Sequence, residues 1–280
     1  MSLLFNRVGR VEIATEDEGI GLDGLRFEFV ARKTRSSTPN SLFVRLYNPS
    51  KNTRELAIDN DADVRVFAGY TSNAVLVSEA NIVTATTRYE PPNVVLEIEA
   101  QEGIRKLREE TISISHGNGA TVRSVLDEIV AELEIDERDT DADLSKPLRG
   151  GFAHVGKITR ALDDLMRRIK GFWSIQNSEL LVLGEKGYID AEEVPLLTPL
   201  SGVVFSPEPI EKQLSSEKED TEPRRGWRVT TLMQPSIEPG GLVQIESREA
   251  DGEYLVDEVE HRGDLHGQEW YSVVTALEKE

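Results

Sequence analysis

Residues Trp227–Trp270 decide the fold: this stretch begins WRVTTLMQPSIEPGGLVQIES (227–247) and ends GEYLVDEVEHRGDLHGQEW (252–270). Apolar residues recur at every second position in short runs, and Pro-Gly-Gly (239–241), Asp251-Gly252 and Gly263-Asp264 separate the runs. This period-two pattern bounded by turn residues predicts antiparallel strands that form a barrel or a sandwich. Nothing in the stretch resembles a nucleophile elbow or a phosphate-binding loop.

The first hundred residues carry the same alternation. In residues 25–31, for example, Leu25, Phe27, Phe29 and Ala31 point to one face. Ser50 or Asn52 is expected to cap a short helical turn. Strands at intervals of about ten residues predict a first β-barrel over residues 1–103; they are expected at residues 7–14, 25–31, 42–47, 64–68, 74–78, 81–89 and 94–100.

The pattern changes to helical spacing after Gly103. Thr121 is the expected N-cap of a helix over residues 122–133, and a second amphipathic helix is expected over 157–170 with Gly171 at its C′ position. A hairpin with Asn177-Ser178 at its turn follows. These elements predict an α+β middle domain, residues 104–186, whose helices share one core; the core is expected to include Leu126, Ile129, Leu162 and Leu165.

Residues 187–280 are predicted to form a second β-barrel domain. A strand is expected to begin near Leu200–Val204. Glu211–Arg225 is charged and has no apolar periodicity, so we hypothesise that it is mobile in the free chain and becomes ordered against a neighbouring subunit. The alternative is a tolerated surface insertion, and deletion of Leu214–Glu222 distinguishes the two. The predicted fold class is therefore mainly β, with two antiparallel β-barrel domains flanking a helix-containing domain.

Composition excludes several classes of protein. The formal charge of −19 disfavours direct nucleic-acid binding, because an acidic surface repels phosphates. Cysteine is absent, so thiolate chemistry and disulfides are excluded. Met1–Asn6 lacks the basic start of a signal peptide, and no apolar run approaches the roughly 20 residues of a membrane helix. The sequence has four basic clusters, Arg32–Arg35, Arg105–Arg108, Arg167–Lys170 and Arg224–Arg225, and the first three are interpreted as scattered solvated cations beside strands or on helix faces.

Histidine and serine patterns do not assemble a site. His261 and His266 flank Gly263-Asp264 and invite a metal hypothesis, but two histidines across a turn do not converge as they do on one helical face. Asp264 is better explained as a cap of the turn backbone. Ser113, Ser115 and His116 lack a nucleophile elbow, and no carboxylate is expected to orient the histidine.

The remaining motifs also favour structural roles. Gly19–Gly24 matches a dinucleotide-loop spacing but precedes a strand, whereas such a loop follows one. Trp173, Trp227 and Trp270 are expected in cores rather than on a stacking platform. We therefore predict no catalytic, cofactor-binding or metal-ligating residue, no cofactor and no enzymatic activity.

A series of short motifs is spread over nearly the whole chain; in order they are Pro39-Asn40, Tyr47-Asn48-Pro49, Ala68-Gly69-Tyr70, Gly119-Ala120-Thr121, Trp173, Gln234-Pro235, Pro239-Gly240, Gly263-Asp264 and Trp270. This ordered series resembles the baseplate hub proteins of contractile-tailed bacteriophages, and the order of the motifs carries the resemblance. Hubs of this family often have Asn-Pro where this chain has Gln234-Pro235.

The resemblance implies two tube-like barrel domains per chain, so that a homotrimer presents six barrels. Such a hub joins a hexameric tail tube to a trimeric central spike and contacts other baseplate proteins. DNA passes through its channel without specific binding, and the hub has no small-molecule substrate. The acidic balance agrees, because a negative channel wall does not trap DNA. The implied location is the virion baseplate, after synthesis in the bacterial cytoplasm.

Three alternatives remain open. The same architecture can serve a phage-derived injection machine or a tailocin. A virion-associated cell-wall hydrolase is a second possibility, although no segment is left over for a hydrolase domain after the three modules. A carbohydrate-binding β module is the third, with little support from an aromatic content of 6%.

Overall fold

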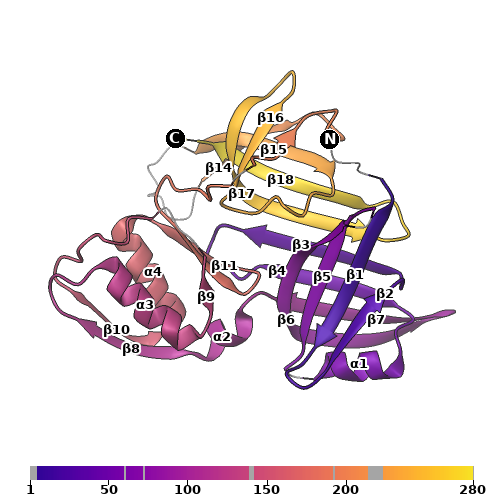
Figure 1. The fold of residues 1–280 in the computed structure, drawn as a ribbon, viewed down its shortest axis with the longest axis horizontal. Helices are drawn as coiled ribbons and strands as arrows, with labels where there is room; N and C mark the ends of the chain where they lie inside the picture. The colour runs from indigo at the N-terminus through magenta and orange to yellow at the C-terminus, as the bar shows by residue number, and fades with distance from the viewer. Residues whose placement is uncertain are drawn as a thin grey trace.

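The computed structural model describes residues 5–59, 61–71, 73–138, 142–191, 193–213 and 223–279. These residues form mainly antiparallel strands, with helices gathered in the middle of the chain (Figure 1). The predicted fold class, mainly β with a smaller α+β part, is confirmed. Within the described ranges no helix has the length and apolar character needed to span a bilayer.

The first β module is built from strands that alternate buried and exposed side chains. Its elements are β1 (Arg7–Ala14), β2 (Gly19–Asp23), β3 (Phe27–Thr34), β4 (Ser41–Tyr47), α1 (Lys51–Ile58), β5 (Asp63–Tyr70), β6 (Asn73–Glu90) and β7 (Asn93–Gln101). The Ser50 hydroxyl accepts a hydrogen bond from the Thr53 N–H and so caps α1, as predicted.

Strand β6 lets the sheet fold over its own core. Its first half pairs with β5 and its second half with β7, and a register shift falls between Ile82 and Thr84. A bulge of this kind increases twist and bends a strand, so one strand can serve two layers. The sequence predicted two separate strands here, and the structure corrects this to one strand of 18 residues.

The middle module packs helices on two small sheets. Its elements are α2 (Ile104–Glu109), β8 (Thr111–His116), α3 (Val122–Leu133), β9 (Asp136–Glu137), β10 (Phe152–Lys157), α4 (Ile158–Ile169), β11 (Phe172–Gln176) and β12 (Glu179–Leu183). Its apolar core contains Leu126, Ile129, Leu162 and Leu165, each without solvent exposure, which confirms the predicted shared core.

Turn and cap residues of the middle module largely follow the sequence prediction. Thr121 caps α3 by accepting from the Ser124 N–H, and Asn177 and Ser178 adopt positive φ at the hairpin turn. One detail is corrected: Lys170, not Gly171, takes the left-handed conformation after α4. Gly171 is needed instead because a Cβ there would lie 2.6 Å from the Leu183 carbonyl oxygen. The sequence also missed helix α2 and strand β10.

The second β module has its own core, which includes Val229, Val243, Val259 and Val274. Its strands are β13 (Leu196–Leu197), β14 (Glu208–Lys212), β15 (Arg224–Leu232), β16 (Leu242–Glu246), β17 (Asp251–Asp264) and β18 (Trp270–Glu278). The strand expected near Leu200 is wrong, because the chain turns there and only Val203 forms an isolated bridge with Thr231.

The prediction that Glu211–Arg225 has no regular structure is corrected at both ends of the segment. Its two ends are paired strands, since Glu211 and Lys212 lie opposite Arg225 and Arg224 in the β14–β15 pair. Residues 214–222, where the rest of that prediction and the deletion fall, lie outside the described residues.

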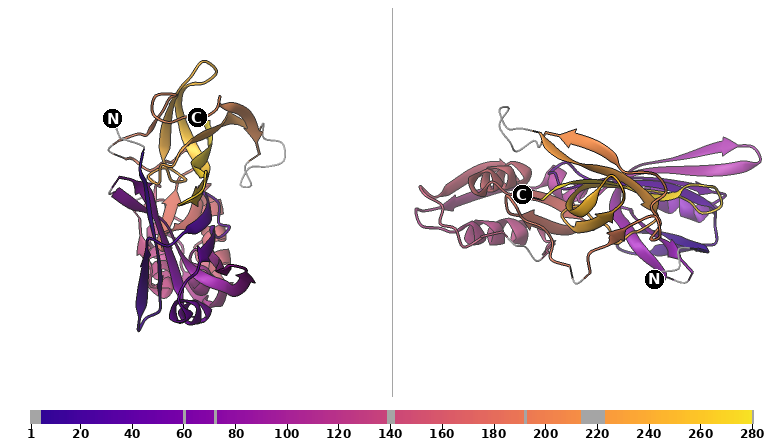
Figure 2. Two further views of the ribbon diagram at one scale, coloured as in Figure 1. Left: turned by 90° about the vertical axis from the view of Figure 1, so that its right-hand side faces the viewer. Right: turned by 90° about the horizontal axis from the view of Figure 1, so that it is seen from above.

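The two β modules share one sheet. Strand β17 pairs with β3 over Glu258–Asp264, so the strand order runs continuously from β14 to β2. Figure 2 shows the second module (orange to yellow) set against the first (indigo to magenta). The end of β17–β18 also enters the first core: Trp270 is fully buried there and meets Phe29 edge to face. Gly263 permits this, because a Cβ would lie 2.3 Å from the Phe29 ring.

Candidate functional site

The serines and the histidine of β8 do not form a catalytic pair. His116 lies on the same strand face as Ile112 and Ile114, whereas Ser113 and Ser115 point to the opposite, exposed face. One expectation is corrected: a carboxylate does orient the histidine, since the His116 Nε2 lies 2.8 Å from the Glu128 Oε2. Because no serine shares that face, the pair is a surface contact at the edge of the middle module.

The two histidines near Gly263 are separated by the fold. His261 is buried on β17, where its Nδ1 lies 2.8 Å from the Ser272 hydroxyl; burial, and then nearby Lys33, lower its pKa to about 3. His266 is exposed on the turn, and its N–H donates to the Asp264 side chain, which confirms the predicted turn cap. Among the described residues no group of three His, Asp or Glu side chains could hold a metal ion.

The other motifs lie in strands and apolar cores, as expected for residues with structural roles. Gly19–Asp23 is strand β2, antiparallel to β1 and followed by β3 rather than by a helix. Trp173 and Trp270 are core residues, and Trp227 packs partly buried against the second β core. The surfaces between the modules are therefore the candidate functional sites.

A buried polar joint connects the first β module to the middle module. Lys33 and Glu102 are 1% and 0% exposed, and the Lys33 Nζ lies 3.4 Å from the Glu102 Oε1. The turn of the β11–β12 hairpin enters this joint: the Asn177 Oδ1 accepts from Lys33 at 2.7 Å, and its N–H donates to Glu102 at 3.0 Å. Both buried charges are therefore paired and hydrogen-bonded, which a buried ion pair requires.

Asn40 holds the joint from the first module. Its amide nitrogen donates to Glu102, to the Gln176 side chain and to the Ile175 carbonyl, each at 3.0 Å. Its amide oxygen accepts from the Thr34 N–H at 2.8 Å. One side chain thus joins the end of β3, the end of β7 and the hairpin, which gives the Pro39-Asn40 motif a structural reason.

A second set of charges links the joint to the second β module. Arg35 lies over the Phe172 ring at 4.2 Å and pairs with Asp257 at 3.4 Å. Lys212 approaches the same carboxylate at 2.7 Å. All three modules therefore meet through buried or half-buried charges.

The burial of Lys33 and Arg35 corrects the interpretation of Arg32–Arg35 as solvated cations. The alternation of side chains along β3 could have indicated this burial. Phe27, Phe29 and Ala31 are buried, and Lys33 and Arg35 continue the same alternating face. Their acidic partners, Glu102 and Asp257, lie far along the sequence. Local composition therefore gave no sign of the pairing.

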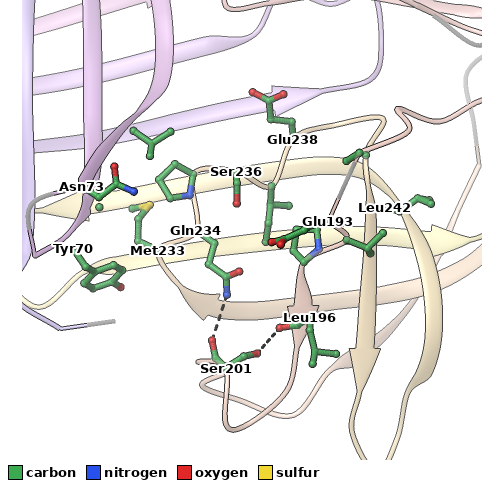
Figure 3. Close-up of a pocket in the computed structure, with 18 of the residues that line it drawn as sticks. Tyr70, Asn73, Glu193, Leu196, Ser201, Met233, Gln234, Ser236, Glu238 and Leu242 are labelled. Carbon is green, nitrogen blue, oxygen red and sulfur yellow. Dashed lines mark hydrogen bonds between the residues drawn. The ribbon is translucent and has the colours of Figure 1, made fainter. Parts of the chain in front are cut away.

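An open cleft of about 1440 Å³ separates the two β modules on another side. Figure 3 shows Tyr70 and Asn73 on one wall and Glu193, Leu196 and Leu242 on the other. Gln234 lies between the walls and donates to the Ser201 carbonyl at 3.5 Å. Burial raises the pKa of Tyr70 to about 12. The cleft is larger than the roughly 300–1,000 Å³ typical of a small-molecule site, which favours a protein segment as its occupant.

No protein-family model matches the chain, and no curated protein does. Solved structures do match over nearly the whole length. The 43 kDa tail protein of prophage MuSo2 from Shewanella oneidensis aligns with a TM-score of 0.66 at 10% identity, covering 96% of this chain and 98% of that one. The chain has the fold of phage tail proteins.

Two further structures carry the same tail-protein fold. The tail protein from Neisseria meningitidis MC58 aligns with a TM-score of 0.66 at 10% identity, over 98% of this chain and 97% of that one. A component of the Escherichia coli type VI secretion system, described as similar to the T4 tail proteins gp27 and gp5, aligns with a TM-score of 0.64 at 10% identity. That match covers 94% of this chain and 76% of the other.

Proposed function

We propose that this chain is a structural baseplate hub of a contractile tail. Three copies form a ring that joins the hexameric tail tube to the trimeric central spike, lines the DNA channel and contacts other baseplate proteins. The virion tail is its location, after synthesis in the host cytoplasm. It has no small-molecule substrate and is not an enzyme.

The observation that carries the proposal is the length of the structural likeness. The tail-protein fold extends over 96% of this chain and 98% of the Shewanella tail protein. Because both β modules and the middle module take part, the likeness concerns the whole arrangement rather than one common β unit. The proposed domains are residues 1–103, 104–186 and 187–280.

The sheet shared by both β modules supports the proposed ring. Two β modules in each of three copies give six units around an axis, which matches the symmetry of a hexameric tube. The β17–β3 pairing holds the two modules of one chain in a fixed register. The charge of −19 favours passage of DNA without binding.

A second setting has its own support. The likeness to a type VI secretion component favours the same hub role in a phage-derived injection machine or tailocin. The genes beside this one decide between the two settings, because a phage also encodes a capsid and an injection machine does not.

Electron cryo-microscopy of particles that carry a tagged copy of the chain tests the hub role. We expect three copies between the tube and the spike. Six copies in one ring, or a place outside the tube axis, contradicts the two-module account. A zone of clearing by the purified chain on a peptidoglycan zymogram contradicts the non-enzymatic role.

A further inference from the structure

Exposed large apolar side chains gather in two places. The first, the cleft patch, consists of Val75, Leu196 and Leu200, which line the cleft between the β modules. Leu200 is 86% exposed, and Val204 and Phe205 continue the exposed apolar surface along the chain. Apolar surface concentrated around a wide cleft marks a protein interaction site rather than ordinary scattered exposure.

The second place, the arm patch, lies on α1 and the second half of β6. It consists of Arg54, Ile58, Val83 and Tyr89; Tyr89 is 73% exposed and its hydroxyl accepts from the Arg54 guanidinium at 3.5 Å. Arg54 and Ile58 are one helical turn apart and share a face of α1. The β6–β7 hairpin projects well beyond the rest of the molecule (Figure 2, right), so this patch is open to a partner.

The two patches carry opposite charges. Glu193 and Glu246 line the cleft, and both are exposed without an ion-pair partner in the described part of the chain. Arg54 likewise pairs with no described carboxylate, since its contacts are the Ser50 carbonyl and Tyr89. The cleft is also lined by Glu238 and Arg138, which pair with each other at 2.6 Å. An apolar surface with a cation and an apolar cleft whose other two carboxylates have no described ion-pair partner are therefore complementary in both polarity and sign.

One copy cannot bring its own patches together. Strand β5 separates them, because α1 ends just before Asp63 and the cleft begins at the other end of the strand, near Tyr70. Eight residues of strand span about 23 Å at the usual rise. Two different surfaces at opposite ends of a rigid element make a head-to-tail contact between copies, and such contacts form a ring when the rotation from copy to copy closes.

We propose that the arm patch of one copy docks in the cleft patch of a second copy, with Arg54 beside the carboxylates of Glu193 and Glu246. Ile58 and Tyr89 then cover the apolar cleft wall around Leu196 and Leu200. The contact repeats around the ring; the number of three copies rests on the proposed hub function.

A cysteine trap tests the contact directly, because the chain contains no native cysteine. The variant with Ile58→Cys and Leu200→Cys is treated with a short bis-maleimide, both as concentrated full-length protein and in assembled particles. We expect covalent oligomers up to the closed trimer on a denaturing gel. The matched control carries Val155→Cys with Leu200→Cys, because Val155 is 83% exposed on β10 outside both patches. Equal cross-linking of the two variants, or none in the first, overturns the proposal.

Charge reversal tests the pairing. Arg54→Glu alone, and Glu193→Lys with Glu246→Lys, are each expected to weaken self-association by roughly tenfold in sedimentation equilibrium, and the three substitutions together to restore it. Arg167→Glu, an exposed arginine of the middle module, is the control with no effect. Failure of the combined variant to recover, when each parent folds, contradicts direct pairing.

Two outcomes separate this contact from the hub function. If the chain is absent from tail particles but concentrated protein is trapped as closed rings, the contact stands and the hub function falls. If the cleft variants self-associate normally but are lost from particles, the cleft binds a different tail component and the second-copy proposal is wrong.

Discussion

The buried joint and the open cleft are both surfaces between modules, yet their chemistry is opposite. The joint is filled and polar, and each of Lys33, Asn40 and Glu102 has hydrogen-bonding partners within the chain. The cleft is open and apolar, and its carboxylates Glu193 and Glu246 have no described ion-pair partner. Buried polar groups without partners are costly, so a satisfied joint fixes the modules in one arrangement. An unfilled apolar cleft leaves stabilisation to be gained from another molecule.

The largest effect is expected from breaking the joint at Glu102. Glu102→Ala leaves Lys33 buried beside Asn177 without its carboxylate, so the free energy of unfolding is expected to fall by about 3–5 kcal/mol. Urea denaturation followed by circular dichroism measures it. Glu55→Ala, which removes an exposed pair with Lys51, is the control and should cost less than about 1 kcal/mol. A similarly small loss at Glu102 means that water already enters the joint.

An apolar core gives the next comparison. Leu162→Ala removes a fully buried side chain of the middle module and is expected to lower the free energy of unfolding by about 2–5 kcal/mol, because it leaves a cavity. The same denaturation experiment measures the change. If the middle module of this variant unfolds in a separate transition from the β modules, the joint couples the modules less strongly than its hydrogen bonds suggest. Unchanged stability would place Leu162 on an exposed face.

His261, beside the joint, makes stability depend on pH. Its pKa falls from 6.5 to about 3 in the folded chain, so below pH 6.5 the unfolded chain takes up a proton that the folded chain does not. The free energy of unfolding therefore falls with decreasing pH, by up to about 1.4 kcal/mol per pH unit between these values.

The contribution of His261 is isolated by comparison with His261→Gln, whose amide can still bond the Ser272 hydroxyl. Denaturation at pH 7 and pH 5 is expected to show the wild type losing about 2 kcal/mol more than the variant over this range. The carboxylates titrate in both proteins and so cancel in the difference. Equal losses of stability in the wild type and the variant would contradict this prediction and show that water or a rearranged partner solvates the charged imidazole.

The smallest effect on stability is expected in the cleft. Leu200→Ser changes a side chain that is 86% exposed, so the free energy of unfolding should stay within about 0.5 kcal/mol of the wild type. Self-association should nevertheless weaken, which sedimentation equilibrium measures. A large loss of stability with normal association would contradict the difference drawn between the joint and the cleft, because Leu200 would then stabilise the fold of its own chain.

Much of the fold was predictable because its causes are local. The alternation of Phe27, Phe29 and Ala31 places one face of β3 in a core, and the positive φ that Asn177 and Ser178 can adopt defines a hairpin turn. Capping by Ser50 and Thr121 depends on residues three positions away. The motifs that resemble tail hubs proved to be turns, caps, joint residues, strand residues and the core residues Trp173 and Trp270, so their order along the chain reports architecture rather than chemistry.

The joint and the cleft were not predictable from local pattern. Arg35 meets Asp257 and Lys33 meets Glu102 only because β17 pairs with β3 and β7 ends beside the hairpin. The cleft likewise combines Tyr70 with Leu196 and Gln234, whose positions depend on how the second module packs on the first.

The sequence by itself determined the strands, helices and turns, because propensity, capping and side-chain alternation act within a few residues. Only the tertiary structure decided that β6 bends as a single strand, that the two β modules share one sheet, and which charges are buried. Those outcomes depend on partners outside the local sequence, such as Glu102 for Lys33 and Asp257 for Arg35. An isolated Lys or Glu carries the same local signal whether its partner is solvent or a distant strand.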